Sequence, residues 1–226
     1  MIVNAVTPDD KRKIFVYEFL NFVEVFVHVV LYTQNVFPKE AFVPHCEYSL
    51  SFLKYIPDND VCAYIASFLS SIETMLEANA LTKVNIVVVD AETNESVEMV
   101  QVNVTRNRHE VLIANDNDSD GDNALKEYHQ ELCLGFRSLI YDFYYGNVNK
   151  KDNTSERVNT TFYLGIETNN TEGKALLHDK QVYNNITQTI NDNYIHNINY
   201  TNYSKRREIA YYDSDNNYSI SIEQRS

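Results

Sequence analysis

Residues 116–127, DNDSDGDNALKE, have the residue types and the spacing of a calcium-binding loop. The sixth position is a glycine, and positions one, three, five and twelve would supply carboxylate ligands, as hard cations prefer: Asp116, Asp118, Asp120 and Glu127. Three features count against calcium. The eighth position is Asn123 where an apolar residue is usual, the preceding segment predicts a strand and not an entering helix, and the pattern has no second copy. The alternative is a solvated acidic loop whose last residues cap the next helix.

The other candidate ligands and nucleophiles are isolated along the chain. Cys46, Cys62 and Cys133 are odd in number and widely separated, so they predict neither a disulfide framework nor a zinc knuckle. His28 stands on the apolar face of a predicted helix, where a hydrogen-bonded core histidine is more usual than a ligand or a switch. We therefore predict no catalytic residue, no metal ligand and no cofactor, and we do not expect an enzyme.

The charge of the chain argues against direct contact with nucleic acids. The 226 residues carry a net charge of -13, whereas a grip on the phosphate backbone needs clustered Lys and Arg. The one dense basic cluster, Lys205-Arg206-Arg207, is expected to be a solvated loop. The first residues lack the basic start and apolar run of a signal peptide, and together with the cysteine pattern this predicts a reduced intracellular compartment.

The element best placed to organise the chain is a helix predicted over residues 13–36. Apolar residues cover more than one stripe of its surface: Phe15, Phe19, Phe22, Val23, Phe26, Val27, Val30 and Leu31. A helix that is apolar nearly all round lies in the middle of a domain. The stretch has the length of a membrane span, but polar residues that are costly in lipid interrupt it about every turn. We therefore predict a buried central helix that stops at Pro38, and no membrane.

Two further helices and four strands are predicted beyond it. One helix covers residues 61–76 after a cap at Asp58 or Asp60, and the other covers 125–143 before a stop at Gly146. Strands are expected at residues 84–89, 100–104, 162–166 and 218–222, and the first two form a hairpin. Helices packed on one sheet, an α+β fold, follow from this order.

The chain after Ile166 has a different composition. Asn, Tyr, Thr and Asp dominate, and apolar residues come singly. Composition leaves two interpretations open: a disordered tail, or edge strands that need a partner to become ordered. The alternation of Tyr218, Ile220 and Ile222 favours a strand at that point.

Four blocks of the sequence carry a family resemblance. The first block comprises Phe22, Val23, Glu24, Val25, Val27, His28, Leu31, Tyr32, Val36, Phe37, Pro38 and Phe42. The others comprise Leu76-Glu77-x-Asn79 with Lys83-Val84, Val87-Val88-x-x-Asp90 and Val97-Glu98; Thr161-Phe162 with Ile166 and Thr168; and Ile220-Ser221-Ile222-Glu223. These blocks resemble the HORMA-domain family, and within it the accessory, non-catalytic subunits of DNA polymerase zeta, and the asparagine-rich composition indicates a fungal form. The resemblance implies one HORMA domain over residues 1–226, with three helices on a mainly antiparallel sheet, a core at 13–168 and a C-terminal safety belt at 169–226.

The resemblance also implies a function. Such a protein is a non-catalytic adaptor that binds a proline-containing peptide of the catalytic subunit of polymerase zeta against a sheet edge and closes the belt over it. It would support translesion DNA synthesis and DNA damage tolerance in the nucleus, and the cytoplasm is an alternative location. The deoxycytidyl transferase of translesion synthesis would be a second partner. The alternatives are a spindle-checkpoint or meiotic HORMA adaptor and, in a different class, a calcium-binding protein.

The same resemblance implies the residues of the peptide site. Tyr64 matches a peptide-contacting tyrosine, and Phe37 replaces a tyrosine at the end of the first helix. Tyr194 and Ile195 stand where the family has a tryptophan in its belt. Leu134 occupies the position of an arginine that supports dimerisation between HORMA domains, which leaves dimerisation of this chain open.

Overall fold

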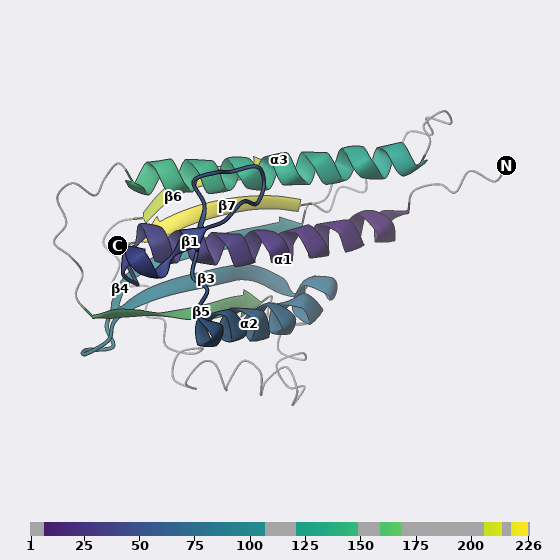
Figure 1. The fold of residues 1–226 in the computed structure, drawn as a ribbon. Helices are drawn as coiled ribbons and strands as arrows, with labels where there is room; N and C mark the ends of the chain where they lie inside the picture. The colour runs from purple at the N-terminus through teal and green to yellow at the C-terminus, as the bar shows by residue number, and fades with distance from the viewer. Residues whose placement is uncertain (1–6, 107–120, 149–158, 169–205, 214–217, 226) are drawn as a thin grey trace.

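The computed structural model describes residues 7–106, 121–148, 159–168, 206–213 and 218–225. Three long helices, α1 (Pro8–Thr33), α2 (Asn59–Glu77) and α3 (Gly121–Val148), pack on a five-stranded antiparallel sheet (Figure 1). Across the sheet the strands follow the order β5 (Thr160–Thr168), β3 (Leu81–Asp90), β4 (Ser96–Arg106), β7 (Tyr218–Arg225) and β6 (Arg206–Asp213). The predicted α+β class is confirmed.

Helix α1 begins earlier and ends earlier than the sequence predicts. The Thr7 hydroxyl accepts a hydrogen bond from the Asp10 N–H (3.2 Å), and the Asp10 carboxylate accepts one from the Thr7 N–H (3.1 Å). This capping box fixes the start of the helix. The helix ends at Thr33 because Asn35 adopts a left-handed conformation with φ of 52°. The predicted stop at Pro38 is therefore wrong, since the helix has ended five residues before it.

Helix α1 is the central element of the core. Within the described residues it is long and apolar enough to span a membrane, but 72% of its most apolar window is buried inside the fold. Its phenylalanines stack on one another and on α3, where the Phe136 ring lies 4.7 Å from that of Phe22. Aromatic contacts of this kind stabilise a core beyond the area they bury.

Strands β3 and β4 form the predicted hairpin, and both are longer than predicted. The Asp90 carboxylate accepts hydrogen bonds from the Glu92 and Thr93 N–H groups (2.9 Å each), which fixes the turn between them. Strand β5 pairs with the other side of β3, with Leu164 opposite Ile86. Alternate residues of these strands face the three helices, and this face of the sheet forms the floor of the core.

Helix α2 confirms one of its two predicted caps, whereas the predicted end of α3 is wrong. The Asp58 carboxylate accepts hydrogen bonds from the Asp60 and Val61 N–H groups, so Asp58 is the cap. Helix α3 continues through Gly146 to Val148, because a helical glycine lowers stability without ending a helix.

The described part of the calcium-loop pattern is helical. The three aspartates at 116, 118 and 120 lie outside the described residues, but α3 already begins at Gly121. A calcium loop needs a sharp turn at that sixth position. Glu127, the twelfth position, lies exposed on the second turn of the helix. This geometry disfavours the calcium interpretation.

The two C-terminal strands complete the sheet. Strand β7 pairs with β4 and lies inside the sheet, so the predicted strand at residues 218–222 is confirmed, but it is not an edge strand. The Tyr218 ring stacks on Phe15 of α1 at 3.6 Å. Strand β6 is an edge strand that the sequence did not predict, and it begins at Arg206, so the expected loop around Lys205-Arg206-Arg207 is wrong for the two arginines.

Strand β6 also packs closely against α3. The Tyr212 ring lies directly over Gly135, where an added methyl group would overlap it. A side chain at position 135 would therefore force the Tyr212 ring to shift, and glycine allows the close approach of β6 to α3.

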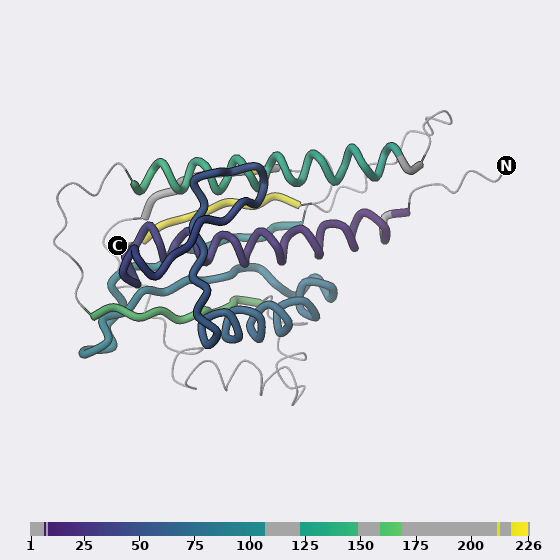
Figure 2. The backbone as a smooth tube through the Cα atoms, in the orientation of Figure 1, coloured from purple at the N-terminus to yellow at the C-terminus, as the bar shows by residue number. Residues whose placement is uncertain are grey.

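Between α1 and α2 the chain runs across α1 toward α3 and returns, as the tube in Figure 2 shows. This connection contains a 3-10 turn (Lys39–Ala41) and two short paired strands, β1 (Val43–Pro44) and β2 (Lys54–Tyr55). Phe52 in this connection stacks on Tyr144 of α3, with ring centroids 4.2 Å apart. The connection thus ties all three helices together and sets the position of Phe37.

Candidate functional site

Three aromatic side chains from distant parts of the chain meet beside β5. The ring of Phe162 on β5 lies 5.5 Å from Tyr64 on α2 and 6.1 Å from Phe37 on the connection after α1, and both pairs meet edge to face. Phe37 and Tyr64 are the two described residues that the sequence predicts for a peptide site, and the structure brings them together through Phe162. The sequence did not identify Phe162 as a site residue.

Strand β5 is an edge strand with backbone groups that face away from the sheet. No described strand pairs with its outer side. The Leu164 N–H donates a hydrogen bond to the Tyr64 hydroxyl (2.9 Å), so this N–H points away from β3. Because the direction alternates along an antiparallel strand, Phe162 and Ile166 also present their N–H and C=O groups to the outer side. An added strand would bind these groups.

The Tyr64 hydroxyl is neutral in this position. Burial raises the pKa of Tyr64 to about 12, whereas the hydrogen bond from Leu164 acts in the opposite direction. The hydroxyl therefore stays protonated at physiological pH. In the described structure it accepts the hydrogen bond of one outward-facing N–H group of β5, that of Leu164. A strand that used the Leu164 N–H would have to displace it.

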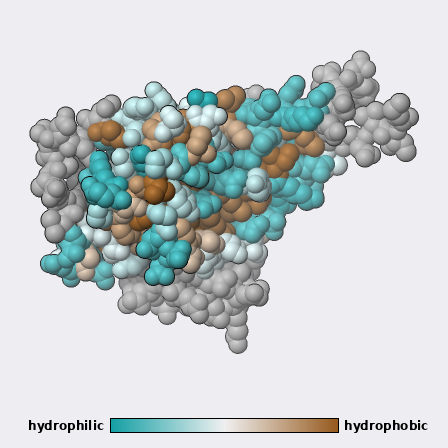
Figure 3. Space-filling model, in the orientation of Figure 1, coloured by the Kyte–Doolittle hydropathy of each residue, from teal (hydrophilic) through white to brown (hydrophobic). Residues whose placement is uncertain are grey.

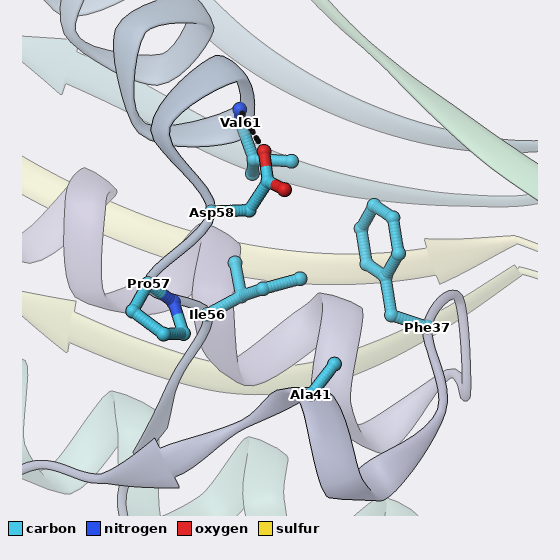
Figure 4. Close-up of a pocket in the computed structure, with 6 residues that line it drawn as sticks. All are labelled: Phe37, Ala41, Ile56, Pro57, Asp58 and Val61. Atoms are coloured by element: carbon cyan, nitrogen blue, oxygen red, sulfur yellow. Dashed lines mark hydrogen bonds between the residues drawn. The ribbon is translucent and has the colours of Figure 1, made fainter.

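Phe37 also lines a pocket of about 390 Å³ (Figure 4). Its walls come from the connection after α1, the segment before α2 and the first turn of α2: Phe37, Ala41, Ile56, Pro57, Asp58 and Val61. In the close-up, Phe37 faces Ile56 and Asp58 across the opening. The lining is mostly apolar, and the Asp58 carboxylate is occupied by the α2 cap. The pocket therefore suits a small apolar ring next to the β5 edge.

His28 lies in the core behind Ile56, one of the residues that line this pocket. It is only 2% exposed, and its Nδ1 accepts a hydrogen bond from the Ile56 N–H (3.4 Å). The Tyr55 ring lies 3.8 Å from the imidazole. Burial, with a smaller contribution from His45, lowers the pKa of His28 to about 4. The structure thus makes His28 a neutral core histidine, as predicted.

The C-terminal strands lie at the far edge of the sheet from β5. Strand β5 ends at Thr168 on one edge, and β6 begins at Arg206 on the other, so residues 169–205 connect opposite edges of the sheet. Tyr194 and Ile195, the other two predicted site residues, belong to this connection and lie outside the described residues.

Leu134, the predicted position of a dimer contact, lies on the outer surface of α3 and is 63% exposed. Tyr141, Tyr145 and Val148 are exposed further along the same helix. Figure 3 shows hydrophobic atoms between α1 and α3, flanked by hydrophilic side chains. Leu134 is therefore a surface residue in the described structure, and dimerisation through it stays a prediction.

Comparison with known proteins shows the fold of the chain. No family model matches the sequence, and no curated protein matches it. Solved structures of HORMA domains, however, match the chain over nearly its full length, with three helices on an antiparallel sheet. The chain has the HORMA-domain fold.

Three of the structures that it resembles are complexes. A chain of the mitotic checkpoint complex superposes with a TM-score of 0.64 at 14% identity, covering 93% of this chain and 97% of that one. HTP-2 of C. elegans bound to the HIM-3 closure motif gives 0.59 at 10% identity, covering 99% of both chains. HTP-2 bound to HTP-3 motif-6 gives 0.63 at 11% identity, again covering 99% of both.

Proposed function

We propose that this chain is a non-catalytic adaptor that binds a short extended peptide of a partner protein along β5. The observation that carries the proposal is the outer side of β5, where backbone groups of three residues face away from the sheet beside Phe37, Tyr64 and the pocket. Main-chain hydrogen bonds to β5 would supply affinity, and the pocket would select a side chain.

The position of the C-terminal strands supports this proposal. Strands β6 and β7 pair on the β4 side of the sheet and leave the β5 edge unpaired by any described strand. Strand β5 ends at Thr168 on one edge and β6 begins at Arg206 on the other, and a belt over a peptide on β5 would need these two strands on opposite edges. Two of the structures with this fold are bound to closure motifs, which is consistent with a peptide ligand.

For the partner we propose the catalytic subunit of DNA polymerase zeta, with a proline-containing segment as the peptide. Support comes from the sequence blocks that resemble the accessory subunits of that polymerase, and from a pocket whose apolar lining suits a proline ring. The chain would then act in translesion DNA synthesis and damage tolerance in the nucleus, with the deoxycytidyl transferase of translesion synthesis as a second partner.

A checkpoint adaptor is the second candidate. The similarity to a chain of the mitotic checkpoint complex favours it, because that match has a TM-score of 0.64 over 93% of this chain. The two candidates share the fold and the site, and they differ in the sequence of the bound peptide. A binding experiment therefore distinguishes the two candidates by the peptide that is offered to the chain.

A pull-down with two baits tests both candidates. The full chain is incubated with the proline-containing segment of the polymerase zeta catalytic subunit and, separately, with a checkpoint closure motif from the same organism. We expect retention by the first bait and a loss when its prolines are replaced by alanine. Retention by the checkpoint motif alone would replace the first candidate with the second, and retention by neither would refute both.

A matched pair of variants locates the site in the same assay. Phe37→Ala removes one wall of the pocket and should weaken binding by roughly 1–3 kcal/mol, or about 5- to 150-fold. Tyr141→Ala removes an exposed aromatic side chain from α3, 49% exposed and away from β5, and should leave binding unchanged. Equal effects of the two variants would contradict the proposed location.

A further inference from the structure

Three side chains with metal-binding atoms converge where α1 meets α3. Glu18 lies on α1, and His129 and Cys133 lie one turn apart on α3. The His129 Nε2 atom lies 2.8 Å from Glu18 Oε1, and the Cys133 Sγ atom lies 3.6 Å from both Glu18 Oε2 and His129 Nε2. Glu18 thus faces His129 with one carboxylate oxygen and Cys133 with the other, and one ligand atom from each of the three residues lies within 4.8 Å of the other two.

This cluster does not have the geometry of a catalytic thiol. In a Cys–His–Glu relay, one imidazole nitrogen contacts the thiol and the other contacts the carboxylate. Here both contacts of His129 use Nε2, so the ring cannot pass a proton from the thiol to the carboxylate. Burial and the Glu18 carboxylate also raise the pKa of Cys133 to about 11, which keeps the thiol protonated and weakly nucleophilic.

The same convergence suits a tetrahedral cation. In a zinc site with bonds of about 2.0 Å to nitrogen or oxygen and about 2.3 Å to sulfur, neighbouring ligand atoms lie about 3.3–3.6 Å apart. The two distances to Cys133 already have this length. The Glu18 Oε1–His129 Nε2 pair is closer because it is hydrogen-bonded, and with Oε1 as the ligand it would open by about half an ångström around an ion.

The surroundings give an ion both a charge and an entry path. The Glu18 side chain is 7% exposed, whereas His129 is 49% exposed, so the cluster is closed on the carboxylate side and open on the imidazole side. The Glu18 carboxylate supplies negative charge to the site. The Tyr48 hydroxyl donates a hydrogen bond to the Glu18 backbone carbonyl (3.4 Å), which helps to fix this turn of α1.

We propose that Glu18, His129 and Cys133 form a binding site for a divalent cation of borderline softness, with Zn²⁺ as the best fit. The three residues would be ligands through Oε, Nε2 and Sγ, and water would take the fourth position. On binding, Cys133 releases its proton to solvent and His129 binds as the neutral imidazole. The ion would fix α3 on α1, and α3 is also the surface on which Tyr212 of β6 docks at Gly135.

Titration of the full-length protein with Co²⁺, followed by absorption spectroscopy, tests the site. Cobalt bound to a thiolate gives a near-ultraviolet charge-transfer band, and tetrahedral coordination gives visible bands. We expect these bands to saturate at about one Co²⁺ per chain and to disappear when Zn²⁺ is added. The absence of a thiolate band would overturn the proposal.

Three variants make the test specific. His129→Gln changes a half-exposed side chain and should weaken Co²⁺ binding at least about tenfold, since even second-shell losses cost that much. Cys133→Ala should abolish the thiolate band, and circular dichroism shows whether each variant is folded. Cys46→Ala removes an exposed cysteine outside the cluster and should leave the band unchanged. A band that persists in Cys133→Ala, or that is lost in Cys46→Ala, would contradict the assignment.

Discussion

Replacement of Tyr64 by phenylalanine should have opposite effects on the stability of the free chain and on peptide binding. The substitution keeps the ring against Phe162 but removes the hydroxyl that accepts the Leu164 N–H at 2.9 Å. A hydrogen bond of this kind contributes about 0.5–1.5 kcal/mol net. We therefore expect Tyr64→Phe to lower the free energy of unfolding by about 1 kcal/mol.

The effect on binding follows from a thermodynamic cycle. If a peptide carbonyl takes the Leu164 N–H, the hydroxyl no longer stabilises that group in the complex. The variant then loses the hydrogen bond in the free state only, and the peptide binds up to about fivefold more tightly. Tyr64→Ala, in contrast, also removes the ring and should weaken binding by roughly 1–3 kcal/mol.

Urea unfolding measures the first effect, and titration with a fluorescent peptide measures the second. Tyr163→Phe is the matched control, because the Tyr163 hydroxyl on the same strand bonds to Asn94 at an exposed position (3.2 Å), and its loss should leave peptide affinity unchanged. A loss of affinity of tenfold or more in Tyr64→Phe would refute the view that a peptide carbonyl replaces the hydroxyl.

Three further predictions concern the scaffold. Gly135→Ala should destabilise the chain by about 1–3 kcal/mol in urea unfolding, because the added methyl group overlaps Tyr212. Gly146→Ala has no neighbour near the added atom and should stabilise the chain by about 0.5–1 kcal/mol. Similar effects of the two variants would contradict the packing of β6 on α3. The pKa of His28 is about 4 in the folded chain and 6.5 in the unfolded chain, so the neutral imidazole stabilises the fold fully above pH 6.5. As the pH falls toward 4, the free energy of unfolding should decrease by roughly 3 kcal/mol. The His28→Gln variant should lack that part of the pH dependence in denaturant titrations, and an unchanged profile would show that His28 is not the titrating group. Asp58→Ala should cost about 1 kcal/mol through loss of the α2 cap, and no change in the unfolding midpoint would contradict that role.

The sequence predicted the elements whose signals are local. The apolar surface of α1, the β-branched run of β3, the alternation of β4 and the cap at Asp58 or Asp60 all act within a few residues, and each appears in the structure, with Asp58 as the cap. Boundaries were less accurate, because the capping box at Thr7 and the left-handed Asn35 were not recognised. At Gly146 the sequence predicted a helix end that the structure does not have, because α3 continues through this glycine to Val148.

The features that the sequence did not predict depend on contacts between distant segments. Strand β6 carries no alternation strong enough to identify it, and it is held by β7 and by the contact with α3. Phe162 joins the site only because the connection after α1 brings Phe37 beside it. Glu18 is 111 residues from His129, so no ligand spacing could identify the cluster they form with Cys133.

Hydrogen exchange of the full-length protein, with and without the proline-containing segment of the polymerase zeta catalytic subunit, tests the central claim most directly. Strand addition gives the outer N–H groups of β5 backbone partners, in place of the Tyr64 hydroxyl at Leu164, so exchange in residues 160–168 should slow markedly in the complex. Exchange in β6, the opposite edge of the sheet, should stay unchanged. Protection confined to β6 or α3, or no protection at saturating peptide, would contradict peptide capture at β5.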